Sequence, residues 1–276
     1  MYTSSMELPF SRWYEVIWIR RSRRQYDSNP LDPDALERLH TVCKAFRPFT
    51  EVRAVLVNHS ADEVFKGIVF HYGKIKGAPA FITFIGNMED PNVHEKLGYM
   101  GEGIVLEATA LNLGTCWVGV SFKPELASHL ARIKKNEKVL ALTPIGYTKE
   151  RWSLEEKIMT GFGRTHKRKS IEKLLTGRKE TPWPLWVKTA LEAARLAPSA
   201  VNRQPWRFSI EQDSIIILVD NLNDTLNISK RLDCGIAMLH IEVASLHCGV
   251  QGVWEFLDSP QVARFNIIKG TYPDEI

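Results

Sequence analysis

Apolar side chains along the chain follow two spacings, and the longer spacing predicts the helices. Residues 33–46 are the clearest case, because their apolar positions recur every three or four residues. Asp32 and Pro33 come at the start of this pattern and suit the N-cap and the first helical position. Similar patterns predict helices at 93–113, where Gly114 ends the helix, and at 171–175, 185–197 and about 235–248.

Short runs rich in β-branched and aromatic residues predict the strands between these helices. They lie at 51–57, 80–85, 115–119 and 139–147, within 206–219, and at 252–256. Because helices and strands alternate along the chain, we expect a layered fold of the α/β or α+β class.

The pattern is interrupted at residues 176–185, where glycine, two prolines and charged residues indicate a boundary. The order of elements after this boundary repeats the order before it. One short match supports the repeat, since Glu107-x-x-x-Leu111-x-x-Gly114 and Glu242-x-x-x-Leu246-x-x-Gly249 fall near the ends of the two long helices. We therefore expect two similar halves, residues 1–178 and 179–276, that form one compact unit.

Composition limits the partners that the chain can have. With 276 residues and 44% hydrophobic positions, it can bury a sizeable core. Its formal net charge of +4, from 36 basic and 32 acidic residues, is too small for a protein that coats nucleic acid through counterion release. The first residues lack a charged leader with an apolar stretch, and no run reaches the roughly 18 apolar residues of a membrane span. We expect a cytoplasmic protein with no membrane or nucleic-acid partner.

Motifs for metal, thiol or dinucleotide chemistry are not evident. The four cysteines are far apart and form no C-x-x-C pair, and the eight histidines lack the spacing of metal ligands. Gly101-Glu-Gly103 and Gly161-Phe-Gly163 are only fragments of a dinucleotide-binding glycine motif. No metal site and no catalytic protein nucleophile are expected.

A dense basic segment, IRRSRRQY at 19–26, suggests an anion site. Arg20, Arg21, Ser22 and Arg24 together supply fixed charge and a hydroxyl, which suit a phosphate. Three interpretations stay open: a nucleic-acid patch, a solvated turn, or the socket for one phosphate of a small molecule. A second cluster at 165–170 contains Lys167 and Arg168 before a short helix, so the two clusters could converge on one phosphate.

The segment APSAVNRQPWRF at 197–208 has a different character. Two prolines stiffen it, and the amides of Asn202 and Gln204 can both donate and accept hydrogen bonds, as the edge of a heterocycle requires. The alternative is an ordinary turn after a helix, followed by a core tryptophan.

These motifs together resemble the signatures of the nitroreductase family of FMN enzymes. They are Arg20-Arg-Ser-x-Arg-x-Tyr26, Leu113-Gly-Thr-Cys-Trp-Val-Gly119, Ile145-Gly-Tyr147 and Ala193-Ala-Arg-x-Ala-Pro-Ser-x-x-Asn-x-Gln-Pro-Trp-x-Phe208. In the common family pattern the arginine motif and the Asn/Gln motif lie close together in one subunit, and two subunits share two FMN sites. Here more than 170 residues separate them. The chain is similar to the putative TM nitroreductase subgroup, which implies an α+β fold with mixed antiparallel sheets, two fused pseudo-dimer halves and one complete FMN site between them.

The resemblance also implies roles for individual residues. Arg20, Arg21, Ser22 and Arg24 would face the phosphate, ribityl and pyrimidine side of FMN, and Lys167 or Arg168 would close over the phosphate. Lys74 matches a basic position near flavin N1 and O2, and the turn from Gly119 to Ser121 matches the backbone that faces N5. The loop from the second half would contribute Pro198, Ser199, Ala200, Asn202 and Gln204.

The implied activity is a two-electron transfer carried by the flavin. The donor would be NAD(P)H or a protein, and the acceptor a nitroaromatic, a quinone or a similar small molecule. With two fused halves the chain could act as a monomer. Two alternatives remain from the sequence: a flavin-binding sensor without efficient turnover, and a nucleic-acid-binding module that uses the two basic clusters.

Overall fold

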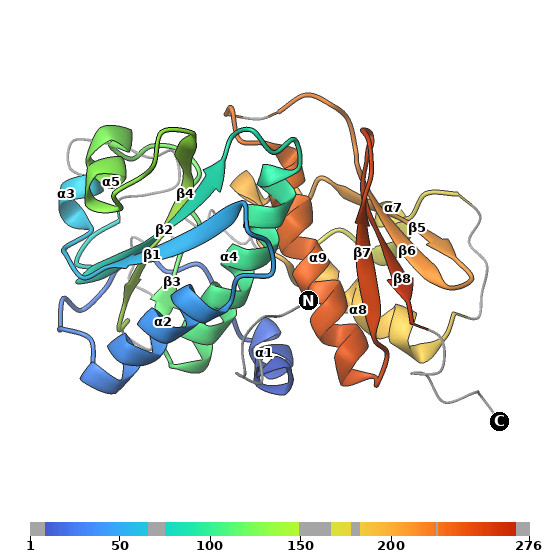
Figure 1. The fold of residues 1–276 in the computed structure, drawn as a ribbon. Coiled ribbons are helices and arrows are strands. Elements are labelled where there is room, and N and C mark those ends of the chain that lie inside the picture. Colours follow the sequence, from blue (N-terminus) through green and yellow to red (C-terminus); the bar gives the residue numbers. More distant parts are fainter. Residues whose placement is uncertain (1–8, 66–74, 149–166, 178–182, 225, 269–276) are drawn as a thin grey trace.

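The computed structural model describes residues 9–65, 75–148, 167–177, 183–224 and 226–268. Within them the chain forms two units that lie on either side of a central pair of long helices (Figure 1). Each unit contains one four-stranded antiparallel sheet, so the expected α+β class is confirmed.

The first unit follows the order helix, two strands, helix, two strands. Its elements are α2 (Pro33–Ala45), β1 (Val52–Val57), β2 (Ala80–Asn87), α4 (Val93–Ala110), β3 (Gly114–Thr115) and β4 (Glu137–Gly146). The strands lie in the order β1-β2-β4-β3. Asp32 caps α2 as its sequence predicts, since its side chain accepts a hydrogen bond from the Asp34 N–H at 2.9 Å.

The second unit repeats this topology. Its elements are α8 (Leu185–Leu196), β5 (Trp206–Glu211), β6 (Ser214–Val219), α9 (Lys230–His247), β7 (Gly252–Phe256) and β8 (Gln261–Ile267). The strands lie in the order β5-β6-β8-β7, which is the same as in the first sheet. Even the irregularity in strand pairing recurs, between Phe84 and Ile85 in β2 and between Ile217 and Leu218 in β6.

The central helices α4 and α9 cross at a pair of glycines. A Cβ atom on Gly98 would lie 2.1 Å from the Leu232 carbonyl oxygen, and one on Gly235 would lie 2.0 Å from the Glu95 carbonyl oxygen. Gly98 and Gly235 are 137 positions apart, and so are Glu95 and Leu232. The contact is therefore self-complementary, as it is across the two-fold axis of a symmetric dimer.

The same offset relates the ends of the two helices, and it corrects the sequence match. Asn112 and Gly249 both have left-handed backbone conformations just after α4 and α9, with φ angles of 59° and 77°. They too are 137 positions apart, whereas the match of Glu107 with Glu242 implied 135. That match was out of register by two residues, because a Leu-x-x-Gly ending fits many helices.

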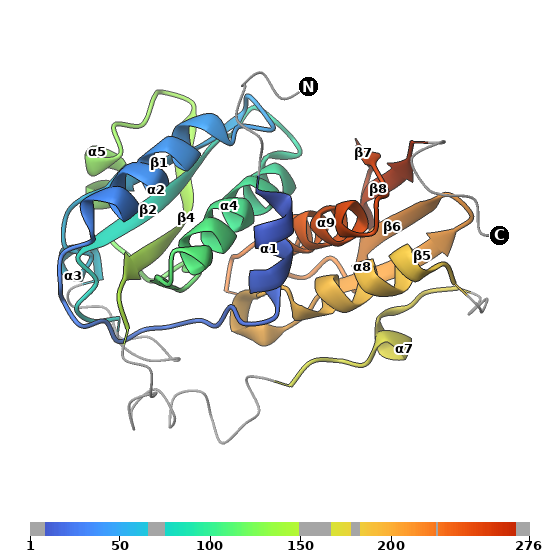
Figure 2. The same ribbon diagram turned by 90° about the horizontal axis from the view of Figure 1, so that it is seen from below.

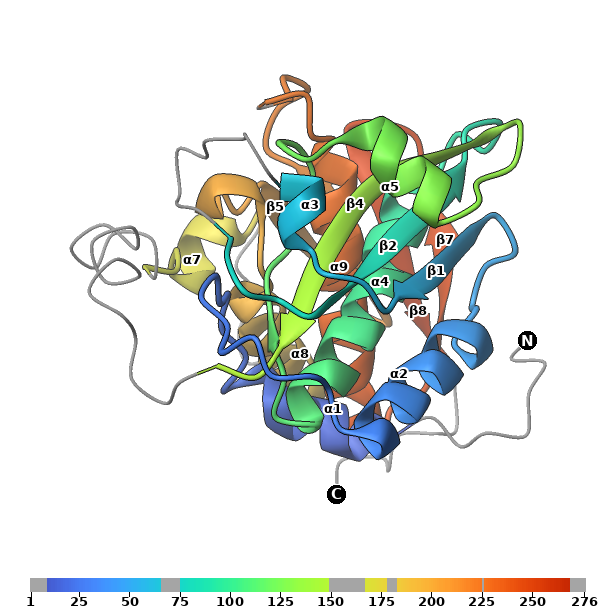
Figure 3. The same cartoon turned by 90° about the vertical axis from the view of Figure 1, so that its left-hand side faces the viewer.

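The remaining elements close the core around these units. The helix α1 (Phe10–Ile17) lies against both α4 and α9 (Figure 2). The helices α3 (Asp62–Phe65) and α5 (Pro124–Leu130) cover the outer face of the first sheet, where they bury a second apolar cluster (Figure 3). The short helix α7 (Ile171–Leu174) lies beside β5, and Thr176 N–H donates to the Phe208 carbonyl at 2.8 Å.

Most predicted elements are present within one to three residues of their expected ends, and two differ. The helix α9 begins at Lys230, earlier than expected, because Ser229 caps it by accepting from the Arg231 N–H at 3.2 Å. Of the predicted strand 115–119, only Thr115 lies in a regular strand, which is β3 (Gly114–Thr115). The helix α1 and the strand β8 were not predicted.

Candidate functional site

The arginine segment after α1 is extended and lies along the edge of the first sheet. Ser22 forms a parallel bridge with Thr115 of β3, and the Arg23 N–H donates to the Thr115 carbonyl at 2.8 Å. Further along, the Lys76 N–H donates to the Arg24 carbonyl at 3.0 Å. These bonds fix the backbone of the segment, so it is held in place relative to the first sheet.

Arg20 is a buried cation with free hydrogen-bonding capacity. It is only 5% exposed, and its Nε and Nη1 atoms find no hydrogen-bond partner among the described residues. The nearest carboxylate is that of Glu102 on α4, 3.8 Å from Nε. Burial lowers the pKa of Arg20, although Glu102 acts in the opposite direction. A buried guanidinium with free donors is costly in a protein, and an anionic ligand would satisfy it.

Arg168, in the segment before α7 that packs on the second unit, brings a second cation near Arg20. Its Nη1 donates to the Asn202 side-chain oxygen at 2.5 Å and its Nη2 to the Leu196 carbonyl at 3.1 Å, while its Nε has no partner among the described residues. Burial, and then the charges of Arg20, Arg21 and Arg195, lower the pKa of Arg168 to about 10. The two basic clusters of the sequence therefore meet in space.

The loop between α8 and β5 holds Arg168 and its neighbours. Gln204 is buried, its Nε2 donates to the Lys167 carbonyl at 3.0 Å, and its Oε1 accepts from the Lys169 N–H at 2.7 Å. The Asn202 Nδ2 also donates to the Lys167 carbonyl, at 3.1 Å. Both amides thus join the loop to the basic segment.

The backbone of this loop is folded tightly. Val201, Asn202 and Gln204 have positive φ angles of 49°, 55° and 48°. Non-glycine residues adopt this conformation only at a cost, and it persists where surrounding contacts determine it. Here the Ser199 hydroxyl accepts from the Gln204 N–H at 3.0 Å.

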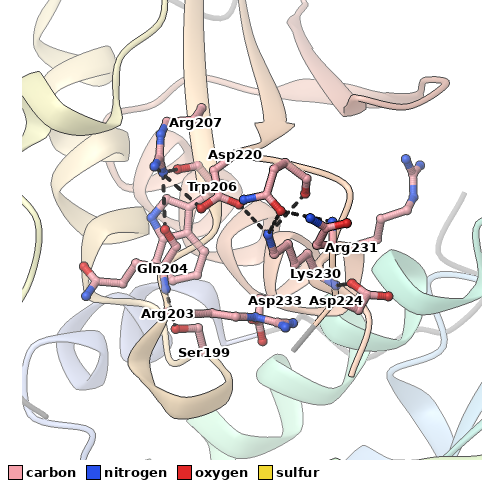
Figure 4. A network of polar contacts seen from close by, with 12 residues as sticks. Ser199, Arg203, Gln204, Trp206, Arg207, Asp220, Asp224, Lys230, Arg231 and Asp233 are labelled. Carbon is pink, nitrogen blue, oxygen red and sulfur yellow. Dashed lines mark hydrogen bonds and ion pairs between the residues drawn. The ribbon is translucent and has the colours of Figure 1, made fainter. Parts of the chain in front are cut away.

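A buried ion pair anchors the loop to α9 (Figure 4). Asp233 accepts from Arg203 Nε at 2.7 Å and from the Ala200 N–H at 3.1 Å. Beside it, the buried Lys230 ammonium donates to Asp220 Oδ1 and to Asn221 Oδ1, each at 2.7 Å. The loop is therefore fixed by satisfied polar contacts, in contrast to Arg20.

Asp233 gives a pH-dependent prediction. Burial raises its pKa to about 6, against the opposing effects of Arg203 and the Ala200 N–H. A carboxyl whose pKa is higher in the folded state than its model value of 3.8 binds more protons when folded, so its contribution to stability increases as the pH falls from about 7 to 4. Between pH 7.5 and pH 5 we expect the wild type to gain about 1 kcal/mol of unfolding free energy relative to Asp233→Asn.

Urea denaturation of both proteins at the two pH values measures this gain. The exposed Asp258→Asn is the control, for which the same comparison should show no comparable gain. A constant difference between wild type and Asp233→Asn would contradict the prediction.

The turn after β3 approaches the same region from the first unit. A Cβ atom on Gly119 would lie 3.1 Å from the Ile228 side chain, and the Ile228 carbonyl accepts from Arg203 Nη2 at 2.9 Å. Ser121 has a positive φ of 64°. The turn from Gly119 to Ser121 thus lies beside the segment that holds the second-unit loop.

The structure therefore brings together many, but not all, of the residues expected from the sequence. Arg20, Arg168 and the 199–204 loop are connected as described. Arg21 is exposed and donates to the Trp18 and Arg20 carbonyls, Lys167 is exposed, and Pro198 is buried. Ser22 and Arg24 are half-buried, and Lys74 lies outside the described residues.

Sequence reasoning missed several residues that shape the site. They are Glu102, Arg195, Asp233 and His240. Arg195 stands in the quoted Ala193-Ala-Arg motif but was given no role, and no local motif marks the other three, because each acts through a partner far away in the sequence. The apolar spacing that predicted helices at 93–113 and 235–248 also gave no reason to expect buried polar groups there, yet Glu102 and His240 are both fully buried.

Two negative findings apply to the described residues. None of the helices there is both long enough and apolar enough to cross a membrane. In the same part of the chain, no three histidine, cysteine or acidic side chains are grouped as a metal site would need.

The fold and the paired units are those of the nitroreductase class. The crystal structure of a "putative nitroreductase" from Thermotoga maritima MSB8 is similar over 92% of this chain and 93% of that chain, with a TM-score of 0.63 and 20% identity. A nitroreductase with bound FMN from Bacteroides fragilis NCTC 9343 matches 51% of this chain and 91% of its own, with a TM-score of 0.42 and 20% identity. A search of curated proteins finds no match.

The sequence itself matches one family model over residues 12–245, and the description of that family is "Putative TM nitroreductase". The chain belongs to this family. The match spans both units, as the resemblance of the sequence motifs implied, and it places the chain among enzymes of the nitroreductase type.

Proposed function

We propose that this chain is an FMN-dependent oxidoreductase with one FMN site, formed between its two units. Two electrons would pass from NAD(P)H or another donor to a nitroaromatic, a quinone or a similar small acceptor. Membership of the nitroreductase family supports the class of reaction. The site itself is supported by the chain's own contacts.

The observation that carries the proposal is the meeting of Arg20 and Arg168. Arg20 follows α1, whereas Arg168 lies in the segment before α7, which contacts the loop of the second unit. Arg20 is buried, Arg168 is half-buried, and both keep guanidinium nitrogens without a partner among the described residues. Burial, and then the charges of Arg20 and other arginines, lower the pKa of Arg168. Like charges are brought together in a protein interior when an anion offsets them, and FMN offers a phosphate and an electron-rich flavin edge.

The residues of the chain would hold and orient this cofactor. Arg20 and Arg168 would donate to its anionic groups, together with the neighbouring Arg21, Ser22 and Arg24. When bound, FMN supplies the capacity to accept and release two electrons. Asn202 and Gln204 would keep Arg168 and the 167–169 segment in position, and the turn at Gly119 to Ser121 would form the wall from the first unit. Lys74, Lys167, Pro198, Ser199 and Ala200 complete the proposed set.

The repeat of the two units defines a second position, equivalent to the proposed FMN site, and its residues support one site rather than two. The 137-residue offset relates Asp233 to Lys96, and Gly119 to Phe256. Val52 and Trp206, which are 154 positions apart, occupy equivalent places at the start of β1 and β5, and this relates Arg203 to Phe49.

At this second position aromatic side chains fill the space. The Phe49 and Phe256 rings are 5.5 Å apart, and Lys96 Nζ lies 5.8 Å and 5.3 Å from their centroids. Where the first site has glycine and an ion pair, the second has two phenylalanines and a lysine. A second flavin would have to displace this packing.

Titration with FMN, followed by turnover, tests the proposed function. Purified protein should bind FMN and then oxidise NADH or NADPH faster when a quinone or a nitroaromatic compound is added. Binding without turnover with any of these acceptors would favour a flavin-binding sensor. No FMN binding, with a salt-sensitive interaction with DNA or RNA instead, would contradict the proposal.

A further inference from the structure

Arg20, Glu102 and His240 form a buried row that crosses from one unit to the other. The row starts at the arginine segment, continues to Glu102 on α4, and ends at His240 on α9. Glu102 and His240 have no exposed surface, and Arg20 is 5% exposed. Glu102 Oε1 lies 3.8 Å from Arg20 Nε and 3.0 Å from His240 Nε2.

The contacts of His240 determine how many protons the pair carries. Nδ1 lies 2.8 Å from the Ala193 carbonyl oxygen, which can only accept, so Nδ1 bears a hydrogen. The contact between Nε2 and Glu102 Oε1 then requires one proton between them. Whether that proton sits on the nitrogen or on the oxygen, Glu102 and His240 together have no net charge.

This cancellation leaves Arg20 without a compensating charge. The other oxygen of Glu102 accepts from the neutral Trp117 indole N–H at 2.7 Å. The remaining groups that act electrostatically on Arg20 are Cys116 and the cation of Arg21, and the Arg168 cation approaches from the segment before α7. A lone Glu102 carboxylate would neutralise Arg20 internally, and a charged ligand would then gain little from it.

We propose that His240 is a positioning residue for the FMN site: it neutralises Glu102, so that Arg20 keeps its full charge for the anionic ligand. The inference rests on the proposed function. It assigns a role to the second unit beyond its loop, because His240 lies on α9 and acts through Glu102 on α4. The row also couples the two units, since removal of a group on α9 changes the charge presented by a residue next to β3.

Net charge predicts which variants lose FMN affinity. In the wild type the row carries +1. Glu102→Gln also carries +1, because a glutamine amide can donate to a neutral His240 Nε2 and accept from Trp117. His240→Gln leaves Glu102 ionised beside Arg20, for a total of zero, and the double variant Glu102→Gln/His240→Gln returns to +1.

Fluorescence titration with FMN, on all four flavin-free proteins, tests this pattern. We expect a Kd at least tenfold higher for His240→Gln, and Kd values within about threefold of wild type for Glu102→Gln and for the double variant. Circular dichroism and thermal denaturation check that each variant is folded. If His240→Gln does not fold, His240→Asn, which also leaves Glu102 ionised beside Arg20, takes its place in the comparison.

The outcomes separate this inference from the proposed function. If the three residues have only a structural role, each single variant should weaken FMN binding, and the double variant should bind no better than His240→Gln. That pattern, or loss of affinity in Glu102→Gln, would overturn the inference. The proposed function would still stand as long as the wild type binds FMN. Equal affinity of His240→Gln and wild type would overturn the inference too. Failure of the wild type to bind FMN would overturn both.

Discussion

Replacement of Arg20 and Arg168 by alanine in one protein is expected to raise the Kd for FMN at least 100-fold. Arg20 is buried, Arg168 is half-buried, and each has a guanidinium nitrogen with no partner among the described residues. A hydrogen bond from a charged donor contributes about 1.5–3 kcal/mol. Two such losses correspond to a factor of at least about 100 in affinity. Equilibrium titration of the flavin-free proteins measures it, and each single variant should show part of the effect.

The stability of the same variant separates a binding role from a structural one. Arg20 and Arg168 repel each other in the flavin-free protein, so the double variant should unfold at a temperature no more than a few degrees below that of the wild type. Arg264→Ala is the control for removal of an arginine, since Arg264 lies on β8 and pairs with Glu255 and Glu211. Unchanged FMN affinity in the double variant would contradict the proposal that Arg20 and Arg168 bind FMN.

The second large effect concerns the helix crossing. Gly98→Ala and Gly235→Ala should each lower the free energy of unfolding by about 3 kcal/mol, because the new methyl group would overlap a backbone carbonyl at 2.1 Å or 2.0 Å and the two helices would have to move apart. In an unobstructed helix the same substitution would stabilise by about 1 kcal/mol. Destabilisation by these substitutions therefore indicates a close helix crossing, and stabilisation indicates an unobstructed one.

Chemical denaturation without FMN measures this effect. Gly119→Ala is the control, since its methyl group would meet only side-chain atoms of Ile228, at 3.1 to 3.3 Å, and no backbone atom among the nearest contacts, so a change within about 1 kcal/mol is expected. A neutral or stabilising effect at both Gly98 and Gly235 would contradict the close crossing and, with it, the self-complementary contact of the two units.

The elements of the fold were largely predictable, because apolar spacing and capping residues are local signals. Asp32 and Pro33 marked the start of α2 correctly. The strand β8 was missed because its sequence, QVARFNI, mixes polar and apolar residues and gains its order from pairing with β6 and β7. The N-terminus of α9 was missed because the cap, Ser229, precedes a turn of polar residues.

The candidate site was predictable only in part. Arg20, Arg168 and Asn202 were found because they stand in recognisable clusters, and the convergence of the clusters was expected from the chemistry of a phosphate. Glu102 and His240 could not be found in this way, since their contact joins residues 138 positions apart in the middle of two long helices. The sequence alignment of the two units was out of register for the same reason. The glycine crossing that defines the correct offset depends on the distance between the two helices, which no local motif reveals.

The measurement that tests the central claim most directly is the FMN content of the purified protein after incubation with FMN and removal of the excess. The visible absorption of the flavin, compared with the protein concentration, should give one FMN per chain, bound between the two units. Two FMN per chain would mean that the position filled by Phe49 and Phe256 also binds flavin. No retained flavin, with no binding detected by titration, would contradict the account of Arg20 and Arg168.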